Sequence, residues 1–260
     1  MRSILVFADR AAAMTSRLET ALSLARADRG HITVIVDTPV SRYISMDPMG
    51  GSYVASDALS EALENDDAYA AEIEAHLDRE DVPFDVLRCE DEPVDALSAA
   101  ARLSDVVLVS HGCPFAGQLA LNARAPVLVL PQDRRLSVPV PVTCVGWDGG
   151  MEAALALRSA ISLVAAGGQV HVLTIDEKPG GFPSGDAMRY LSRHGVSAEL
   201  HALTRGVSTE ETLAGAVKDL GADLLVMGAY GHSRMREYLF GGVTRYFLEA
   251  ADGPALLLAH

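Results

Sequence analysis

The amino-acid sequence repeats one pattern of apolar runs halfway along its 260 residues. In the first half, an apolar run over residues 4–7 is followed by Asp9 and by a helical pattern that ends at Gly30. From residue 140 the same order starts again, with an apolar run over residues 142–147, then Asp148, then a second helical pattern. A tandem repeat of this length predicts two similar units, each large enough to bury a core of its own.

Strand-like runs alternate with helical patterns through both halves. The apolar runs cover residues 4–7, 32–36, 84–87, 106–109 and 127–130 in the first half, and 142–147, 170–175, 198–203, 224–227 and 255–258 in the second. Ser208 and Glu211 form a capping box, which predicts the start of a helix. Strands that alternate with helices are typical of a parallel sheet with helices on both faces. The predicted fold class is therefore α/β, as two tandem Rossmann-like units that each hold a five-stranded parallel sheet.

A proline-rich stretch over residues 131–141 favours an extended connector between the units. We place the boundary near residue 136, so that the units cover residues 1–136 and 137–260. Aligned from their first strands, the halves match Asp9 with Asp148 and Asp37 with Asp176. The first half then has about 21 extra residues around 46–80, and the second has about 10 extra after its fourth strand. We interpret the first insertion as the lead-in to a long helix, with a cap over a pocket or a partner contact as the alternative.

The charge balance limits the classes of partner. Thirty-five acidic residues against twenty-one Lys and Arg give a formal charge of −14, which repels nucleic acid and anionic membrane surfaces alike. We therefore expect no nucleic acid and no membrane partner, whereas a small phosphorylated ligand is compatible because backbone N–H groups can hold it. The three cysteines are far apart and odd in number, and no segment resembles a signal peptide. These features predict a cytoplasmic protein.

A glycine-rich segment follows the fourth apolar run of the second half directly. It reads Gly228-Ala229-Tyr230-Gly231, then nine residues, then Gly241-Gly242-Val243-Thr244 at the start of a predicted helix. Glycines at a strand end permit positive φ and close backbone approach, and a helix N-terminus adds unpaired N–H groups and a favourable dipole. The spacing therefore predicts a site for a phosphate chain. Glycines that serve only the turn are the weaker interpretation, because the expansion is absent from the first half.

Asp148 ends the first strand of the second half, where ligands of open parallel sheets usually bind. Its carboxylate is expected to accept hydrogen bonds from ribose hydroxyls or to hold Mg²⁺, although Asp9 has the same place in the half without the loop. Thr174 and Ile175, at the end of the neighbouring strand, are expected to face a base. The predicted nucleotide-contacting residues are Gly146, Asp148, Thr174, Ile175, Met227, Gly228, Gly231, His232, Ser233, Gly241, Gly242, Val243 and Thr244.

The run from Met227 to Thr244 resembles the G-x2-G-x9-G-[S/T] signature of ATP-binding universal stress proteins. The resemblance is close over the second half and holds in outline over the first, so the chain is similar to tandem-type members with a degenerate first unit. The family implies the strand order 3-2-1-4-5 and pairing of units through their last strands. It also implies ATP bound by the first-strand Asp, the second strand end and the glycine loop. Gly242 departs from the signature, because the family has Ser or Thr there, and Ser233 or Thr244 would have to supply the hydroxyl.

The function that follows is that of an ATP-binding regulatory protein of the stress response, with or without Mg²⁺, assembled as a homodimer. A slow ATPase is one alternative, although the loop offers no evident general base and no catalytic residue is predicted. A nucleotide-free scaffold that acts through dimer surfaces is the other, and Gly242 favours it. A dinucleotide oxidoreductase is excluded, because neither first-strand turn carries the G-x-G-x-x-G fingerprint.

The first half has no room for a triphosphate loop after its fourth strand, where it reads Ser110-His111-Gly112-Cys113-Pro114. Cys113 is either a thiolate stabilised at a helix N-terminus, with His111 nearby, or an ordinary half-buried thiol, and we favour the second interpretation. No spacing that would build a metal site with the cysteines is found for His31, His76, His194, His201 and His260. No metal site is predicted.

Overall fold

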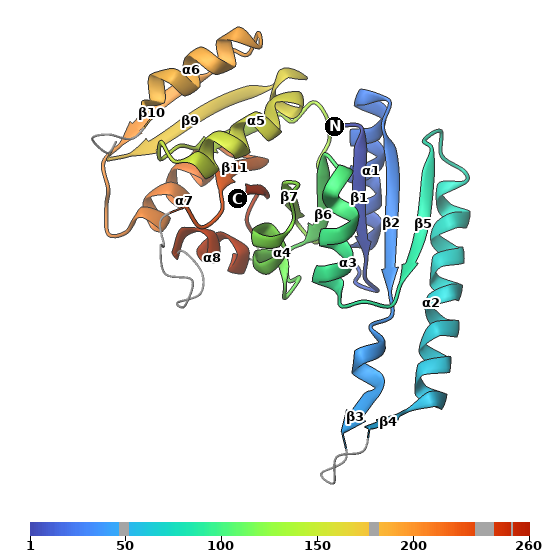
Figure 1. The fold of residues 1–260 in the computed structure, drawn as a ribbon. Helices are drawn as coiled ribbons and strands as arrows, with labels where there is room; N and C mark the ends of the chain where they lie inside the picture. The colour runs from blue at the N-terminus through green and yellow to red at the C-terminus, as the bar shows by residue number, and fades with distance from the viewer. Residues whose placement is uncertain (47–51, 177–181, 232–241, 251) are drawn as a thin grey trace.

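A computed structural model describes residues 1–46, 52–176, 182–231, 242–250 and 252–260 of the chain. Its centre is one ten-stranded sheet with the order β10-β9-β8-β11-β12-β7-β6-β1-β2-β5 (Figure 1). The strands of the first unit in this sheet are β1 (Ser3–Ala8), β2 (His31–Asp37), β5 (Phe84–Cys89), β6 (Val106–Ser110) and β7 (Val127–Leu130). Those of the second unit are β8 (Val142–Gly146), β9 (Gln169–Ile175), β10 (Glu199–Leu203), β11 (Leu224–Gly228) and β12 (Ala255–Ala259).

Helices cover both faces of this sheet. The first unit contributes α1 (Met14–Asp28), α2 (Ser56–Leu77), α3 (Pro93–Ala100), α4 (Ala116–Asn122) and the short 3-10 turns η1 (Val40–Tyr43) and η2 (Ala101–Leu103). The second contributes α5 (Met151–Ala165), α6 (Ser184–Arg193), α7 (Thr209–Asp219) and α8 (Gly242–Glu249). Ser208 caps α7 by accepting a hydrogen bond from the Glu211 N–H at 3.1 Å, which confirms the predicted helix start. None of the described helices is both long and apolar enough to cross a membrane.

Each unit has the strand order 3-2-1-4-5, and the two units meet at their last strands. Within each unit the strands pair in parallel, whereas β12 pairs with β7 in the antiparallel direction. The antiparallel pair joins two sheets of five into one. The predicted α/β fold, the strand order and the pairing through last strands are thus all confirmed.

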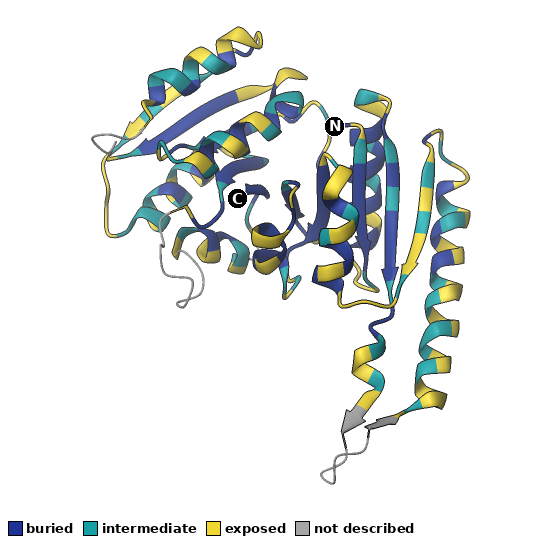
Figure 2. Ribbon diagram, in the orientation of Figure 1, coloured by how far each residue is buried: buried dark blue, intermediate teal, exposed yellow. Residues whose placement is uncertain are grey.

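Two apolar layers, one on each face of the sheet, form the core. The first layer packs α1, α2, α5 and α6 against the sheet, and includes Leu22, Leu77 and Leu157. The second packs α3, α4, α7 and α8 against the other face, and includes Leu119 and Leu213. The central strands are buried almost throughout. The edge strands β5 and β10 consist of exposed and partly buried residues (Figure 2). Continuous apolar runs in the sequence therefore belong to strands covered on both sides.

Equivalent hydrogen bonds define which residues of the two units correspond. The Asp105 N–H donates to the Ser3 carbonyl, and the Asp223 N–H donates to that of Val142. Ser3 of β1 therefore corresponds to Val142 of β8, and the same offset matches Asp9 with Asp148. At the next strand, the Thr38 N–H donates to the Cys89 carbonyl, and the Asp176 N–H donates to the Leu203 carbonyl. Thr38 therefore corresponds to Asp176. The alignment of Asp37 with Asp176 was therefore wrong by one residue, and Asp37 corresponds to Ile175.

The extra residues of the first unit form an arm that extends beyond the sheet (Figure 1). After η1 the chain forms the antiparallel pair β3 (Ile44–Met46) and β4 (Ser52–Val54), and then enters α2. The predicted lead-in to a long helix is thus present, as a small hairpin.

Candidate functional site

A cavity of about 490 Å³ opens at the carboxyl ends of β8, β9 and β11 in the second unit. Its described lining is Gly146, Trp147, Asp148, Glu152, Ala153, Leu173, Ile175, Asp176, Arg205, Thr209, Glu210, Leu213, Met227, Gly228, Tyr230, Gly231, Gly242, Val243 and Thr244. Strand β8 is the point where the strand order of the unit reverses, since β9 and β11 lie on its two sides. The cavity therefore lies where ligands of open parallel sheets bind. A smaller hollow between α1 and α5 has Leu24 and Leu163 among its walls and contains none of the predicted site residues.

Most of the predicted site residues line this cavity together. They are Gly146, Asp148, Ile175, Met227, Gly228, Gly231, Gly242, Val243 and Thr244. Thr174 is buried and is not among the lining residues, because neighbouring residues of a strand point to opposite faces and Ile175 takes the cavity side. His232, Ser233 and Gly241 lie outside the described residues.

Gly228 lets the end of β11 pass against the first turn of α5. A β-carbon on Gly228 would lie 2.6 Å from the backbone nitrogen of Ala153 and 2.7 Å from the carbonyl carbon of Glu152. Contacts this short with backbone atoms require α5 to shift. A β-carbon on Gly231 would lie 2.9 Å from Oε2 of Glu152. The glycines at these two positions therefore permit close approach of the strand end to the helix that follows β8.

The turn after β11 bends sharply at Tyr230, whose φ of 61° lies in the left-handed region. The Tyr230 N–H donates to Oγ1 of Thr244 at 3.4 Å, which ties the turn to the first residues of α8. Nδ1 of His260 lies 2.9 Å from the Ala229 carbonyl and holds the same turn against the last strand. As a result, the strand end and the N-terminus of α8 border one cavity.

Asp148 and Gly146 form the part of the cavity nearest to β8. One carboxylate oxygen of Asp148 accepts a hydrogen bond from the Gly150 N–H at 2.9 Å, and the side chain lines the cavity. A β-carbon on Gly146 would make ordinary contacts, at 3.6 Å from Met227 and 3.7 Å from Leu213. The missing side chain at Gly146 therefore leaves space in the cavity rather than avoiding a collision.

Several lining residues, including most of the charged ones, were not predicted from the sequence. Asp148 was predicted, whereas Glu152, Asp176, Glu210 and Arg205 were not, and together these five give the described lining an excess of negative charge. Their positions follow a signal that the sequence contains, because each lies just after a strand or in the first turn of the next helix, at the carboxyl edge of the sheet. Leu213 lies further along α7 and comes into the cavity only through tertiary packing.

In the first unit, the place that corresponds to the cavity contains the side chain of Arg17, which is fully buried. Its guanidinium donates to Oγ of Ser110 at 2.9 and 3.1 Å, to Oδ2 of Asp9 at 3.1 Å, and to the Phe7 carbonyl. By the correspondence of the strands, the second unit has Ala156, Gly228 and Gly146 where the first has Arg17, Ser110 and Phe7. Three small residues in the second unit are thus replaced by three larger ones in the first.

The thiolate interpretation of Cys113 is wrong. Burial raises the pKa of this thiol to about 11, so that it stays protonated at neutral pH. Helix α4 begins at Ala116, and His111 is buried with its Nε2 3.3 Å from the Pro254 carbonyl of the second unit. Burial also lowers the pKa of His111, which favours its neutral form. His111 thus contacts the second unit, and Cys113 is the ordinary half-buried thiol that we favoured.

Together these features define a duplicated α/β protein with a cavity at the carboxyl edge of its second unit. The model of the universal stress protein family matches residues 142–259, and this second unit belongs to that family. The whole chain is similar in fold to a universal stress protein from Archaeoglobus fulgidus DSM 4304, with a TM-score of 0.75 at 15% identity, over 99% of this chain and 96% of that one.

Two further solved structures also match over the full length. A functionally unknown protein from Pseudomonas aeruginosa PAO1 aligns with a TM-score of 0.64 at 17% identity, over 100% of this chain and 92% of that one. A putative universal stress protein from Pseudomonas aeruginosa UCBPP-PA14 aligns with a TM-score of 0.58 at 16% identity, over 100% and 93%. No curated protein matches the chain. The full-length matches extend the universal stress protein fold to the first unit.

Proposed function

We propose that the second unit binds ATP together with Mg²⁺, and that occupancy of this one site regulates the protein during stress. The observation that carries the proposal is the cavity of about 490 Å³ between β8, the glycine turn and the N-terminus of α8, a size typical of small-molecule sites. The residues present fit a nucleotide in each of its parts, as follows.

The apolar wall suits the base. Leu173, Ile175, Leu213 and Met227 line one part of the cavity, and flat apolar surfaces of this kind accept a purine ring. Asp148 lies beside them and can accept hydrogen bonds from ribose hydroxyls, because one of its oxygens is held by Gly150 and fixes the orientation of the carboxylate. The strand end with Gly228 and Gly231 and the start of α8 at Gly242 offer backbone N–H groups to phosphates.

The charge of the lining favours the magnesium complex over the free nucleotide. Asp148, Glu152, Asp176 and Glu210 place four carboxylates around the cavity against the single guanidinium of Arg205 among its described lining. Free ATP would meet net repulsion there, whereas a divalent ion between phosphates and carboxylates turns the repulsion into attraction. When bound, Mg²⁺ would supply that charge compensation, and Glu152, next to Gly231, is the nearest carboxylate to the glycine turn.

One site per chain is proposed, because Arg17 fills the corresponding place in the first unit. One chain also supplies the pairing of two units through β7 and β12, so a homodimer, as expected from the sequence, would use another surface. The three free thiols agree with the proposed cytoplasmic location.

Binding to the purified full-length protein tests the proposal. Calorimetric titration with ATP, ADP and AMP, each with and without Mg²⁺, should give one site per chain and tighter binding with the ion. Asp148→Asn should weaken binding, whereas Asp105→Asn, a substitution of the same type at a strand start in the first unit, should not. Absence of binding by every nucleotide would favour the scaffold alternative. Phosphate release over many turnovers, lost in Asp148→Asn, would favour the ATPase.

A further inference from the structure

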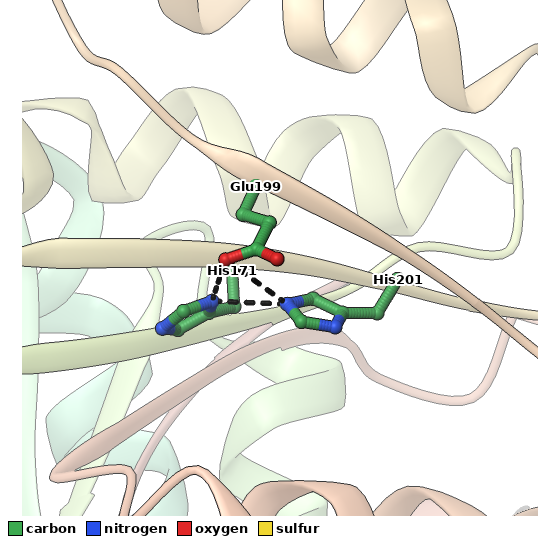
Figure 3. A group of neighbouring side chains, drawn as sticks. All are labelled: His171, Glu199 and His201. Atoms are coloured by element: carbon green, nitrogen blue, oxygen red, sulfur yellow. Dashed lines mark hydrogen bonds and ion pairs between the residues drawn. The ribbon is translucent and has the colours of Figure 1, made fainter.

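Three side chains able to bind a metal meet on the neighbouring strands β9 and β10. The strands pair in parallel with Glu199 opposite His171, and His201 follows two residues after Glu199. Paired residues share a face of the sheet, as do residues two apart on one strand. His171, Glu199 and His201 therefore project to the same side of the sheet and converge there (Figure 3).

The ligand atoms of the three side chains lie at the corners of a small triangle. Nδ1 of His171 is 3.0 Å from Nε2 of His201, and Oε2 of Glu199 is 3.7 Å from the first nitrogen and 3.9 Å from the second (Figure 3). In a tetrahedral zinc site, bonds of about 2.0–2.2 Å put the ligand atoms about 3.3–3.6 Å apart. The three separations lie close to this spacing, so a small shift of the side chains would bring all three atoms to one ion.

The surroundings suit a bound ion that stays accessible from solvent. His171 is buried at 8% exposure, His201 is partly exposed and Glu199 is exposed on the edge strand of the sheet. The buried imidazole holds a fixed position, whereas the open side lets an ion enter and leaves a coordination position to water. Without an ion, the two imidazole nitrogens, 3.0 Å apart, form a hydrogen bond in which one ring donates its N–H and the other accepts. A bound ion would take the place of that proton.

We propose that His171, Glu199 and His201 bind a divalent transition-metal ion, namely zinc. Two imidazoles and one carboxylate with an open fourth position form a ligand set that zinc accepts in tetrahedral geometry. Magnesium and calcium prefer sites made of oxygen ligands alone, and therefore do not suit a site with two nitrogens. This group could not be predicted from the sequence, because only the pairing of β9 with β10 brings His171 next to residues 199 and 201.

The zinc site is separate from the cavity of the second unit. His171 lies on β9 ahead of Leu173 and Ile175, which line the cavity, and on the same face of the strand. Neither His171 nor Glu199 nor His201 is among the described lining residues of the cavity. Zinc binding is therefore expected with or without nucleotide, and the test is made without nucleotide so that no phosphate binds the metal.

Titration of the metal-free full-length protein with zinc, followed by competition with a chromophoric chelator, tests the proposal. We expect one zinc per chain, and an upward shift in Tm because the ion binds only the folded pair of strands. His201→Asn should weaken binding more than 100-fold, since loss of a residue that merely orients a ligand already costs about 10 to 100-fold. His194→Asn, the same change at the exposed histidine that directly follows α6, should leave binding unchanged.

Glu199→Gln serves as the second variant, because it changes an exposed side chain to one of equal size and leaves the imidazoles in place. It should weaken zinc binding while the Tm of the metal-free protein stays that of the unmodified protein. X-ray diffraction at the zinc absorption edge should place the ion among the three side chains. No zinc uptake, or zinc uptake that both His201→Asn and Glu199→Gln leave unchanged, would overturn the proposal and leave a hydrogen-bonded histidine pair only.

Discussion

At the scale of single residues, Asp9 and Asp148 show how neighbours decide what one carboxylate does. Both follow the first strand of their unit, and both accept a hydrogen bond from the N–H group two residues on. In the first unit Asp9 also pairs with the buried guanidinium of Arg17. In the second unit, Ala156 occupies the position of Arg17, and the Asp148 side chain lines the cavity. Arg17, with Ser110 and Phe7 around it, thus fills in the first unit the place that Ala156, Gly228 and Gly146 leave open in the second.

Asp37 offers a prediction at the same scale, because burial raises its pKa to about 6 although Arg42 acts in the opposite direction. An unfolded aspartate titrates near pH 3.9, so between about pH 4 and pH 6 the folded protein keeps a proton that the unfolded chain has lost. The free energy of unfolding should therefore fall as the pH rises through this window. Above about pH 6 Asp37 is ionised in both states, so its contribution to the free energy of unfolding no longer changes with pH.

Asp37→Asn removes this titration and should make the protein more stable than the unmodified chain at pH 7, with no advantage at pH 4. Urea denaturation at a series of pH values measures the difference. The matched control is Asp85→Asn, on the exposed strand β5 that pairs with the strand of Asp37. It should not change how the free energy of unfolding depends on pH between about pH 4 and pH 6. Parallel stability curves for Asp37→Asn and the unmodified protein would contradict the assignment.

At the scale of elements, the contact between the end of β11 and the start of α5 requires a residue without a side chain. Gly228→Ala would bring a β-carbon within 2.6 Å of the Ala153 backbone nitrogen, and should destabilise the protein by about 1–3 kcal/mol. Gly242→Ala is the matched substitution, because its nearest neighbour would be Oε1 of Glu210 at 3.6 Å, an ordinary contact. Chemical denaturation of both variants compares them. Equal losses of unfolding free energy in the two variants would contradict the close contact of β11 with α5.

The capped start of α7 gives a second prediction at this scale. The Ser208 hydroxyl accepts a hydrogen bond from the Glu211 N–H, and the helix that begins there carries Leu213 and Glu210 into the cavity wall. Ser208→Ala should reduce the free energy of unfolding by about 1 kcal/mol. Ser208→Asp, which restores an N-cap acceptor, should recover most of that loss in the same denaturation measurement. No loss in Ser208→Ala would show that the cap contributes nothing.

The sequence predicted the elements well and the site in part, for physical reasons that differ. Apolar runs such as residues 106–109 become buried strands because sheets covered on both faces admit few other residues. The glycines after β11 stood out because a turn at that spacing needs them. Arg17, Leu213 and the trio around His171 could not be found in this way, since their roles depend on which strands and helices become neighbours.

At the scale of the whole molecule, the antiparallel pair of β7 and β12 joins the units into one sheet. Leu256, Leu257 and Leu258 of β12 are fully buried at this seam. Residues 137–260 alone would expose the edge of β12, and an exposed apolar edge strand tends to pair with another. We therefore expect this fragment to form dimers, as measured by size-exclusion chromatography with light scattering.

The matched piece is residues 1–136, which would expose the edge of β7 in the same way and should also form dimers. Circular dichroism of both pieces establishes that each is folded. A folded, unmodified fragment that stays monomeric at high concentration would contradict the view that β12 is an edge made for pairing.

The most direct test of the central claim, one nucleotide site in the second unit only, is calorimetric titration of the full-length protein with ATP and Mg²⁺. We expect one site per chain, and an affinity at least about 10-fold lower in Gly146→Val, because the new side chain occupies cavity space while its β-carbon makes only ordinary contacts. Ala8→Val, a similar enlargement at the last residue of β1 in the first unit, should leave the affinity unchanged. Two sites per chain, or binding that Gly146→Val does not alter, would contradict it.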